Sequence, residues 1–290
     1  MIDFKMMQDA SEIVSYDKPG IPLYIREGFL SDYPHYSALM HWHPDIELIY
    51  IISGSMEYDI SGEHIVLHEN DLLFVNSENM HYGFSSQKKE CHFLCVLFDP
   101  DLLRSNSTIF ETYVNPVIKD KSVTHMIFSK NNILNKSIRK LFECKISETG
   151  AYELTCTGIL FEMWKEFSDA YSSITITNTS IPDNVAEIQK KMVSFIYKNY
   201  AEDLTIEKIA KSANISRSTC CLIFKKYIKT TPIDFLNQYR MELVKRLLVN
   251  SDYSVTDIAT SCGFNHMSYF SKQFKKETGQ TPTAYRKANR

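Results

Sequence analysis

The sequence predicts an α+β protein of two domains. An N-terminal antiparallel β-barrel or sandwich carries a helical hairpin, and an all-α domain follows. Short β-rich runs recur at hairpin spacing before residue 100, and helical periodicity starts near residue 131. The charge also changes sign: residues 184–290 hold 18 Lys and Arg against nine Asp and Glu, whereas residues 1–183 hold 14 against 26. Two halves of opposite charge favour different partners, and the basic half is a candidate for binding a polyanion.

Composition excludes several other classes of protein. A length of 290 residues suits two domains of about 100–200 residues each, and a 44% hydrophobic content supplies their cores. The longest apolar runs are far shorter than the roughly 20 residues of a membrane span. The first residues lack the pattern of a secretory signal, and the seven cysteines form no disulfide framework. We therefore expect a cytoplasmic protein with no membrane partner.

The first domain is predicted at residues 1–171. Its strands are predicted at 21–26, 46–52, 56–60, 64–67, 72–75 and 91–98. Turn pairs such as Ser53-Gly54 separate them. Two helices are predicted at 131–147 and 151–171 and form an antiparallel hairpin, because Gly150 interrupts the helical pattern. Residues 172–183, which are rich in Ser, Thr and Asn, are predicted to be a linker.

The second domain, predicted at 184–290, repeats internally. Phe224-Lys225-Lys226 followed by Thr231-Pro232 recurs 50 residues later as Phe274-Lys275-Lys276 followed by Thr281-Pro282. Chance rarely preserves both sequence and spacing over such a distance. A duplicated supersecondary unit is therefore the simplest explanation.

Each copy has the pattern of a helix-turn-helix. Hydroxyl residues suited to N-caps, Thr205 and Ser254, precede the two short first helices. Asn265 is predicted to cap the second helix of the second copy. The residues predicted to face inward on that helix are Tyr269, Phe270 and Phe274. A long helix that starts at Pro232 joins the copies as a rigid spacer.

The outer faces of the second helices are the predicted DNA contacts. Polar side chains reach base edges in the major groove, and lysines bind phosphates without reading sequence. The first copy presents Arg217, Ser218, Cys221, Leu222, Lys225 and Lys226, and the second presents His266, Met267, Ser268, Ser271, Lys272, Lys275 and Lys276. The alternative is a helical bundle whose charged residues only face solvent.

Residues 184–290 resemble the tandem helix-turn-helix domain of the AraC/XylS family of bacterial transcription regulators. The residues that carry the resemblance are Ile209-Ala210, Phe224-Lys225-Lys226, Thr231-Pro232, Arg240, Leu247-Leu248, Ile258-Ala259, Gly263-Phe264, Ser268-Tyr269-Phe270-Ser271-Lys272, Phe274-Lys275-Lys276, Thr281-Pro282 and Tyr285-Arg286. It implies two recognition helices in successive major grooves of double-stranded DNA, and it adds Arg240 to the DNA contacts. The family usually has a polar residue and an Arg where this chain has Cys221 and Leu222. Because neither residue can make a bidentate base contact, we expect apolar contact with thymine methyl groups there.

A second pattern lies among the predicted strands. His41-Trp42-His43 precedes Glu47 and Gly54 at the spacing of the first cupin motif, except that His35 stands in place of its leading glycine. His81 lies 34 residues beyond Glu47, where the second motif places its histidine. The resemblance implies a cupin or jelly-roll-like barrel. Alternate residues of a strand share a face, so we expect His41 and His43 to point into it.

We interpret His41, His43, Glu47 and His81 as effector-binding groups that use no metal or other cofactor. The same set suits iron, manganese or zinc as an alternative, and a third possibility is that these residues only hydrogen-bond to one another in the core. The favoured function is a one-component transcription regulator, not an enzyme, whose effector is a carbohydrate by family resemblance. We expect a homodimer through helices 131–171, and RNA polymerase as a further partner if the protein activates transcription. Two rivals stay open: a metal-dependent enzyme fused to a DNA-binding tail, and a ligand-independent regulator whose barrel only oligomerises.

Overall fold

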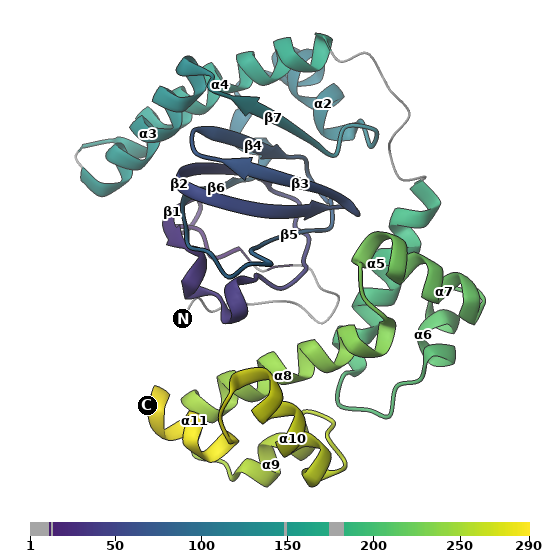
Figure 1. Ribbon diagram of the computed structural model, residues 1–290. Coiled ribbons are helices and arrows are strands. Elements are labelled where there is room, and N and C mark those ends of the chain that lie inside the picture. Colours follow the sequence, from purple (N-terminus) through teal and green to yellow (C-terminus); the bar gives the residue numbers. More distant parts are fainter. Residues whose placement is uncertain (1–11, 13, 148–149, 174–182) are drawn as a thin grey trace. The chain divides into compact units, whose positions relative to one another are not determined.

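The computed structural model describes residues 12, 14–147, 150–173 and 183–290. Contacts divide the described residues into two compact units, one reaching Ala186 and the other comprising Glu187–Arg290. The first contains strands with covering helices, and the second contains helices alone (Figure 1). Most of the predicted linker falls on residues 174–182, which lie outside the described residues, while residues 172 and 173 belong to a helix.

The first unit is built on antiparallel strands. They are β1 (Leu23–Phe29), β2 (Ile46–Ile60), β3 (Glu63–His68), β4 (Asp71–Val75), β5 (His81–Phe84), β6 (Cys91–Phe98) and β7 (His125–Ser129). The order β1-β6-β2-β4-β7 forms one layer, and β3 and β5 pair with the C-terminal part of β2. The predicted barrel class is confirmed. Strands β5 and β7 are not among the predicted strands, because both are short.

Strand β2 unites two of the predicted strands, 46–52 and 56–60. The turn predicted at Ser53-Gly54 is wrong, because this pair forms an irregularity inside one long strand. The register between β2 and β6 shifts between Ile51 and Ser53. Gly54 has a φ of 83°, and a Cβ there would lie 2.5 Å from the carbonyl oxygen of Glu90, so only glycine fits. The irregularity lets β2 pair first with β4 and β6 and then with β3 and β5.

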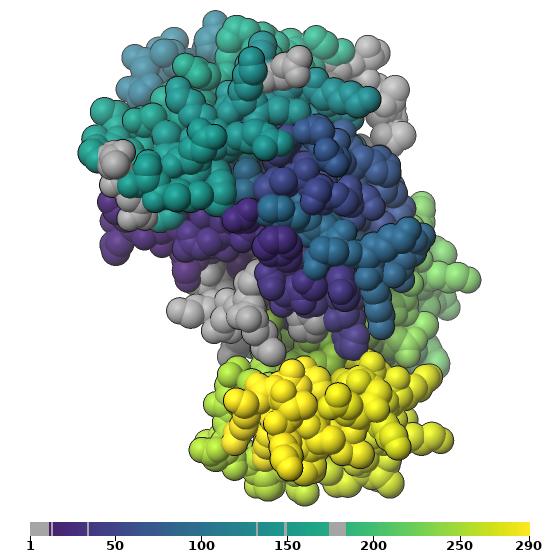
Figure 2. Space-filling view, turned by 60° about the vertical axis from the view of Figure 1, so that its left-hand side comes forward, coloured from purple at the N-terminus to yellow at the C-terminus, as the bar shows by residue number. Residues whose placement is uncertain are grey.

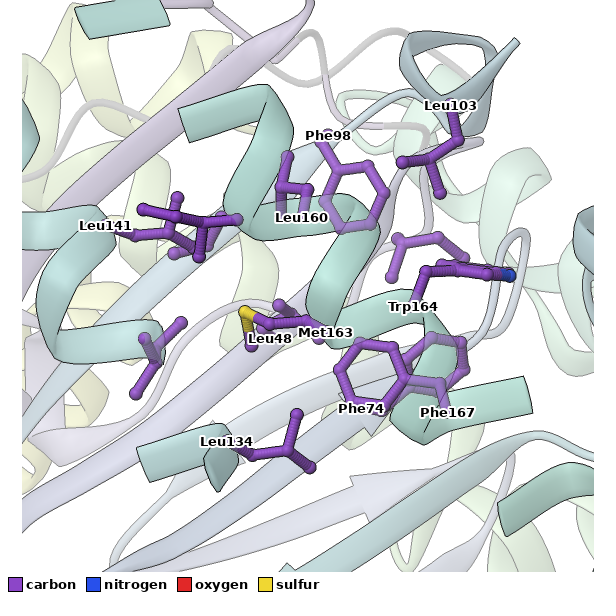
Figure 3. Close-up of a cluster of buried hydrophobic side chains, with 14 of the residues drawn as sticks. Leu48, Phe74, Phe98, Leu103, Leu134, Leu141, Leu160, Met163, Trp164 and Phe167 are labelled. Atoms are coloured by element: carbon purple, nitrogen blue, oxygen red, sulfur yellow. The ribbon is translucent and has the colours of Figure 1, made fainter. Parts of the chain in front are cut away.

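Two helices cover one face of the strands, as the predicted hairpin requires. They are α3 (Asn132–Ser147) and α4 (Tyr152–Ser173), and two short helices, α1 (Ser107–Ile109) and α2 (Asn115–Lys119), precede them. Leu48 and Phe74 from the strands meet α4, where the Phe74 ring centroid lies 5.0 Å from Phe167 and 6.0 Å from Trp164 (Figure 3). In Figure 2 the side chains of α3 and α4 (teal) form a broad surface beside the strands (purple and blue). This apolar layer leaves the other strand face to line the interior of the barrel.

The alternation of β2 decides which residues enter that interior. Ile46, Leu48 and Tyr50 pack toward the helices, whereas Ile49 and Ile51 belong to a second buried cluster with Tyr58 and Phe93. Glu47 shares the face of Ile49, because successive residues of a strand point to opposite sides. The carboxylate of Glu47 is thereby placed inside the barrel.

The second unit consists of helices in a repeated arrangement. They are α5 (Asp183–Asn199), α6 (Ile206–Ser212), α7 (Arg217–Ile223), α8 (Pro232–Asn250), α9 (Val255–Ser261), α10 (Met267–Thr278) and α11 (Pro282–Asn289). The pairs α6–α7 and α9–α10 are the two helix-turn-helix copies, and the long helix α8 joins them (Figure 1). The predicted all-α tandem arrangement is confirmed.

The N-cap and turn residues of the second unit act as predicted, with one exception. The hydroxyl oxygens of Thr205 and Ser254 accept backbone N–H groups at the starts of α6 and α9. Gly263 turns the second copy with a φ of 83°. The predicted cap at Asn265 is wrong: the N-cap position of α10 is His266, which makes no capping hydrogen bond through its side chain.

Candidate functional site

The strands of the first unit surround a cavity of about 110 Å³. Its polar lining comes from β1, β2, β6 and the segments before them and comprises Glu12, Ser15, Tyr24, Arg26, Glu27, Tyr33, His41, Glu47, Tyr58 and Cys95. Two of the four predicted effector-binding residues, His41 and Glu47, therefore lie on the cavity wall. The other two, His43 and His81, lie behind the wall and contact Glu47. No sequence motif singles out Tyr24, Tyr33, Tyr58 or Arg26 as lining residues.

The cavity offers hydrogen-bond donors and an excess of negative charge. Burial raises the pKa of the Tyr24, Tyr33 and Tyr58 phenols, so these side chains keep their O–H donors. Among the described residues, three carboxylates line the cavity against one guanidinium, that of Arg26. Arg26 is also ion-paired with Asp17. Such a lining suits neutral hydroxyl groups better than an anionic ligand.

Glu47 is the centre of a buried cluster behind this wall. One of its carboxylate oxygens lies 3.2 Å from Nε2 of His43 and 2.9 Å from Nε2 of His81. The Tyr58 hydroxyl donates to the other oxygen. Burial alone would raise the pKa of Glu47, but His81 and His43 hold it well below its usual value. The predicted grouping of His41, His43, Glu47 and His81 is therefore real in space, with all four residues at most 4% exposed.

Backbone pairing brings His81 to the other members of the cluster. His41 and His81 form an isolated antiparallel bridge, with N···O distances of 3.1 and 2.9 Å in the two directions. The bridge joins the segment before β2 to the start of β5. Nε2 of His41 lies 3.2 Å from a carboxylate oxygen of Glu12. The cluster thus combines residues from three separate segments.

In the second unit, α10 presents a polar face opposite its buried one. Phe270 and Phe274 are fully buried, whereas Ser268, Ser271 and Lys272 are exposed. His266, Lys275 and Lys276 are exposed too, and Met267 is half-buried against the core. Tyr269 was predicted to face inward but is 53% exposed, next to Ser268 and Lys272. It is a further candidate contact, missed because it precedes the buried Phe270 directly in sequence.

Helix α7 presents a less polar face. Arg217 and Ser218 are exposed at its start, and Arg217 forms an ion pair of 3.0 Å with Glu207. Leu222 is 62% exposed and Cys221 is half-buried. Lys225 and Lys226 are exposed in the π-helical turn Phe224–Ile228 that continues the helix.

Arg240 does not belong with these outward residues. Its guanidinium donates to the backbone carbonyls of Tyr200 and Glu202, at 2.7 Å each. Arg286 on α11 makes the same kind of contact with the carbonyls of Leu248 and Tyr253. The prediction of Arg240 as a DNA contact is therefore corrected: its donors close a turn inside the unit.

A barrel with a cavity and two helix-turn-helix copies with exposed basic residues define a DNA-binding transcription regulator with a ligand-binding domain. Comparison with known families agrees. The AraC-like ligand binding domain matches residues 25–162, and a helix-turn-helix domain matches residues 209–288. The chain belongs to the AraC/XylS family of transcription regulators.

Relatives and solved structures cover most of the chain. The HTH-type transcriptional regulator YdeC of Bacillus subtilis is 27% identical over 100% of both chains. The melibiose operon regulatory protein of Escherichia coli is 24% identical over 88% of this chain and 85% of its own length. The structure of ToxT from Vibrio cholerae, with a TM-score of 0.46 and 14% identity, covers 93% of this chain and 97% of that one. Among the described residues, no helix combines the length and apolar character needed to span a membrane.

Proposed function

We propose that this regulator binds a neutral carbohydrate in the barrel cavity and changes its activity on DNA in response. The observation that carries the proposal is the cavity itself, with its tyrosine and histidine donors and its carboxylate acceptors. Sugar hydroxyls both donate and accept, so they match this lining. His41 and Glu47 contact the effector, and His43 and His81 position Glu47. Relatives named for the melibiose and lactose operons support the same class.

Thermal denaturation of the purified full chain tests the ligand class. Neutral mono- and disaccharides, including melibiose and lactose, are compared with a long-chain fatty acid at matched concentrations. We expect a neutral sugar to raise the melting temperature, because a ligand that binds only the folded state stabilises it. Turnover of a sugar by the metal-loaded chain would favour the rival enzyme. Stabilisation by the fatty acid alone would reject the carbohydrate class, and no shift with any ligand would favour a barrel that only oligomerises.

We propose that the two recognition helices, α7 and α10, make different contacts with DNA. On α10, His266, Ser268, Ser271 and Lys272 reach base edges while Met267 packs beneath them, and Lys275 and Lys276 bind phosphates. On α7, Arg217 and Ser218 read bases, Cys221 and Leu222 contact thymine methyl groups, and Lys225 and Lys226 bind phosphates. Because α8 is a single helix from Pro232 to Asn250, the two half-sites lie about one helical turn of DNA apart.

Lys272→Ala and Lys276→Ala are a matched pair that tests these contacts. Lys272→Ala is expected to relax base preference in one half-site and to cost about 1–3 kcal/mol of specific binding. Lys276→Ala should weaken binding to all sequences and reduce the slope of log affinity against log salt by about 1. Binding-site selection from a random duplex library, followed by salt titrations, separates the two effects. If Lys272→Ala leaves every base preference unchanged and Leu222→Ala erases several, the assignment is reversed.

We also propose a cytoplasmic homodimer that contacts RNA polymerase where it activates. Helices α3 and α4 leave Ile133, Ile146 and Leu154 exposed, the last of them at 74%, and we propose that the interface covers these apolar side chains. Sedimentation of the full chain at micromolar concentration should show a dimer. A double variant, Ile146→Glu with Leu154→Glu, should be monomeric, whereas Tyr113→Glu, a control at another exposed apolar residue of the unit, should stay dimeric. A wild-type monomer, with and without DNA, would contradict the proposal.

A further inference from the structure

We propose that Lys245 is a positioning residue for the second recognition helix, α10. Lys245 lies on α8, and its Nζ atom lies 2.6 Å from a carboxylate oxygen of Glu242 on the same helix and 2.8 Å from one of Glu277 in the last turn of α10. Its side chain is 3% exposed. The ion pair with Glu277 therefore joins the spacer helix directly to a recognition helix. The inference rests on the proposed base contacts of α10 and adds a residue that acts on DNA through that helix.

The apolar contacts between α8 and α10 hold the two helices together but define their alignment loosely. Phe270 and Phe274 of α10 share one buried cluster with Met241 of α8. The burial of apolar surface has no direction, so a small rotation or shift of α10 changes its free energy little. A charge-assisted hydrogen bond with an N···O distance of 2.8 Å requires its two atoms to meet at one position. The contact between Lys245 and Glu277 therefore fixes the alignment of α10 on α8.

The first helix-turn-helix copy has another residue at the position of Glu277, and its recognition helix ends differently. Tyr227 stands 50 residues before Glu277, which is the spacing of the repeat. The chain from Phe224 to Ile228 forms a π-helical turn, whereas the equivalent residues 274–278 continue α10 as an α-helix. Turns of this kind are rare and are frequent at functional sites. Because the regular end of α10 accompanies the ion pair, we expect loss of the pair to affect α10 and not α7.

Lys245 also balances negative charge at the end of α10 that is proposed to contact phosphates. Lys275 and Lys276, the proposed phosphate contacts, directly precede Glu277. A neutral residue in place of Lys245 would leave Glu242 and Glu277, whose side chains are 12% and 25% exposed, without its positive charge. Their charge would weaken binding to every DNA sequence, whereas a realigned α10 would change base preference. The two effects are separable, because neutralising Glu277 removes the same contact and changes the net charge in the opposite direction.

Binding-site selection with the full chain tests the inference through this pair of variants. Lys245→Met and Glu277→Gln each remove the contact between α8 and α10. We expect both to reduce discrimination between bases in the α10 half-site by about tenfold and to leave the α7 half-site unchanged. Binding to non-specific DNA should weaken in Lys245→Met and strengthen in Glu277→Gln. Lys191→Met is the matched control, because Lys191 forms an exposed ion pair of 2.7 Å with Glu187 within α5.

A triple variant separates positioning from stability. Glu242→Leu, Lys245→Met and Glu277→Met together replace the ion-paired group by apolar side chains, a change that is often neutral or stabilising at buried sites. We expect this chain to unfold at the urea concentration of the wild type or a higher one, and to show the same relaxed base preference in the α10 half-site. The triple variant and Glu277→Gln decide the question even where Lys245→Met alone fails to fold.

Three results would overturn the positioning role. These are wild-type base preferences in Glu277→Gln and the triple variant, equal losses of discrimination in both half-sites, or a loss confined to Lys245→Met, which would assign the effect to charge. An equal loss in Lys191→Met would count against it in the same way. A wild-type chain without base preference in the α10 half-site would reject the proposed base contacts themselves. Failure of the inference and failure of the proposed function are therefore distinguishable.

Discussion

Phe270→Ala is expected to destabilise the second unit by about 3–5 kcal/mol and to abolish DNA binding, whereas Tyr269→Ala should leave folding nearly unchanged. Phe270 is fully buried, with its ring centroid 5.1 Å from Phe264 and 5.8 Å from Phe274. Truncating it leaves a cavity in a small core that holds α10 in place. Tyr269 is 53% exposed on the same helix, and exposed substitutions usually change stability by less than about 0.5 kcal/mol.

Urea denaturation and DNA affinity, both measured on the full chain, check the pair. Tyr269→Ala should weaken binding to the selected duplex, because its ring lies beside Ser268 and Lys272 on the proposed base-reading face. Tyr269→Phe is the control that keeps the ring and removes only the hydroxyl. Equal losses of stability in Phe270→Ala and Tyr269→Ala would show that both aromatic residues are core residues, as the sequence pattern predicts.

Glu47→Ala is expected to abolish the response to the effector while DNA affinity in its absence stays unchanged. The substitution removes a cavity-lining acceptor, and it also leaves His43, His81 and Tyr58 without the carboxylate that they contact. The proposed DNA contacts lie on other elements, in the second unit. The first unit should lose stability as well, by about 1–3 kcal/mol, since buried polar groups lose a partner.

Two further variants separate the roles of Glu47. Glu57→Ala is the matched control, a glutamate of the same strand that pairs with surface residues and not with the cavity. Tyr24→Phe changes the cavity lining without touching the histidine cluster. We expect a normal response from Glu57→Ala and a weakened response from Tyr24→Phe, in assays of DNA affinity with and without the stabilising sugar. A full response in Glu47→Ala would reject the cavity as the effector site.

Several features follow from the sequence alone because they depend on neighbouring residues. The 50-residue repeat predicts two helix-turn-helix copies. The hydroxyl groups of Thr205 and Ser254 cap helices through contacts within a single helical turn. The alternation in β2 puts Glu47 on the same face as Ile49 and opposite Leu48. The grouping of His41, His43, Glu47 and His81 also follows from sequence, through the resemblance to the cupin motifs.

Other features are decided only by tertiary contacts. Strand β2 continues through the turn predicted at Ser53-Gly54. Glycine is required at position 54 because the carbonyl of Glu90, which is far away in the sequence, lies against it. Arg240 turns inward because the chain after α5 presents the backbone carbonyls of Tyr200 and Glu202 to its guanidinium. Tyr269 and Phe270 are consecutive residues of α10, and the position of the neighbouring helices decides which of the two rings is buried. The sequence by itself determines the elements, their repeat and the chemistry of the inward residues. Which side chains face the cavity, and which face solvent on the recognition helices, depends on packing between segments far apart in the chain.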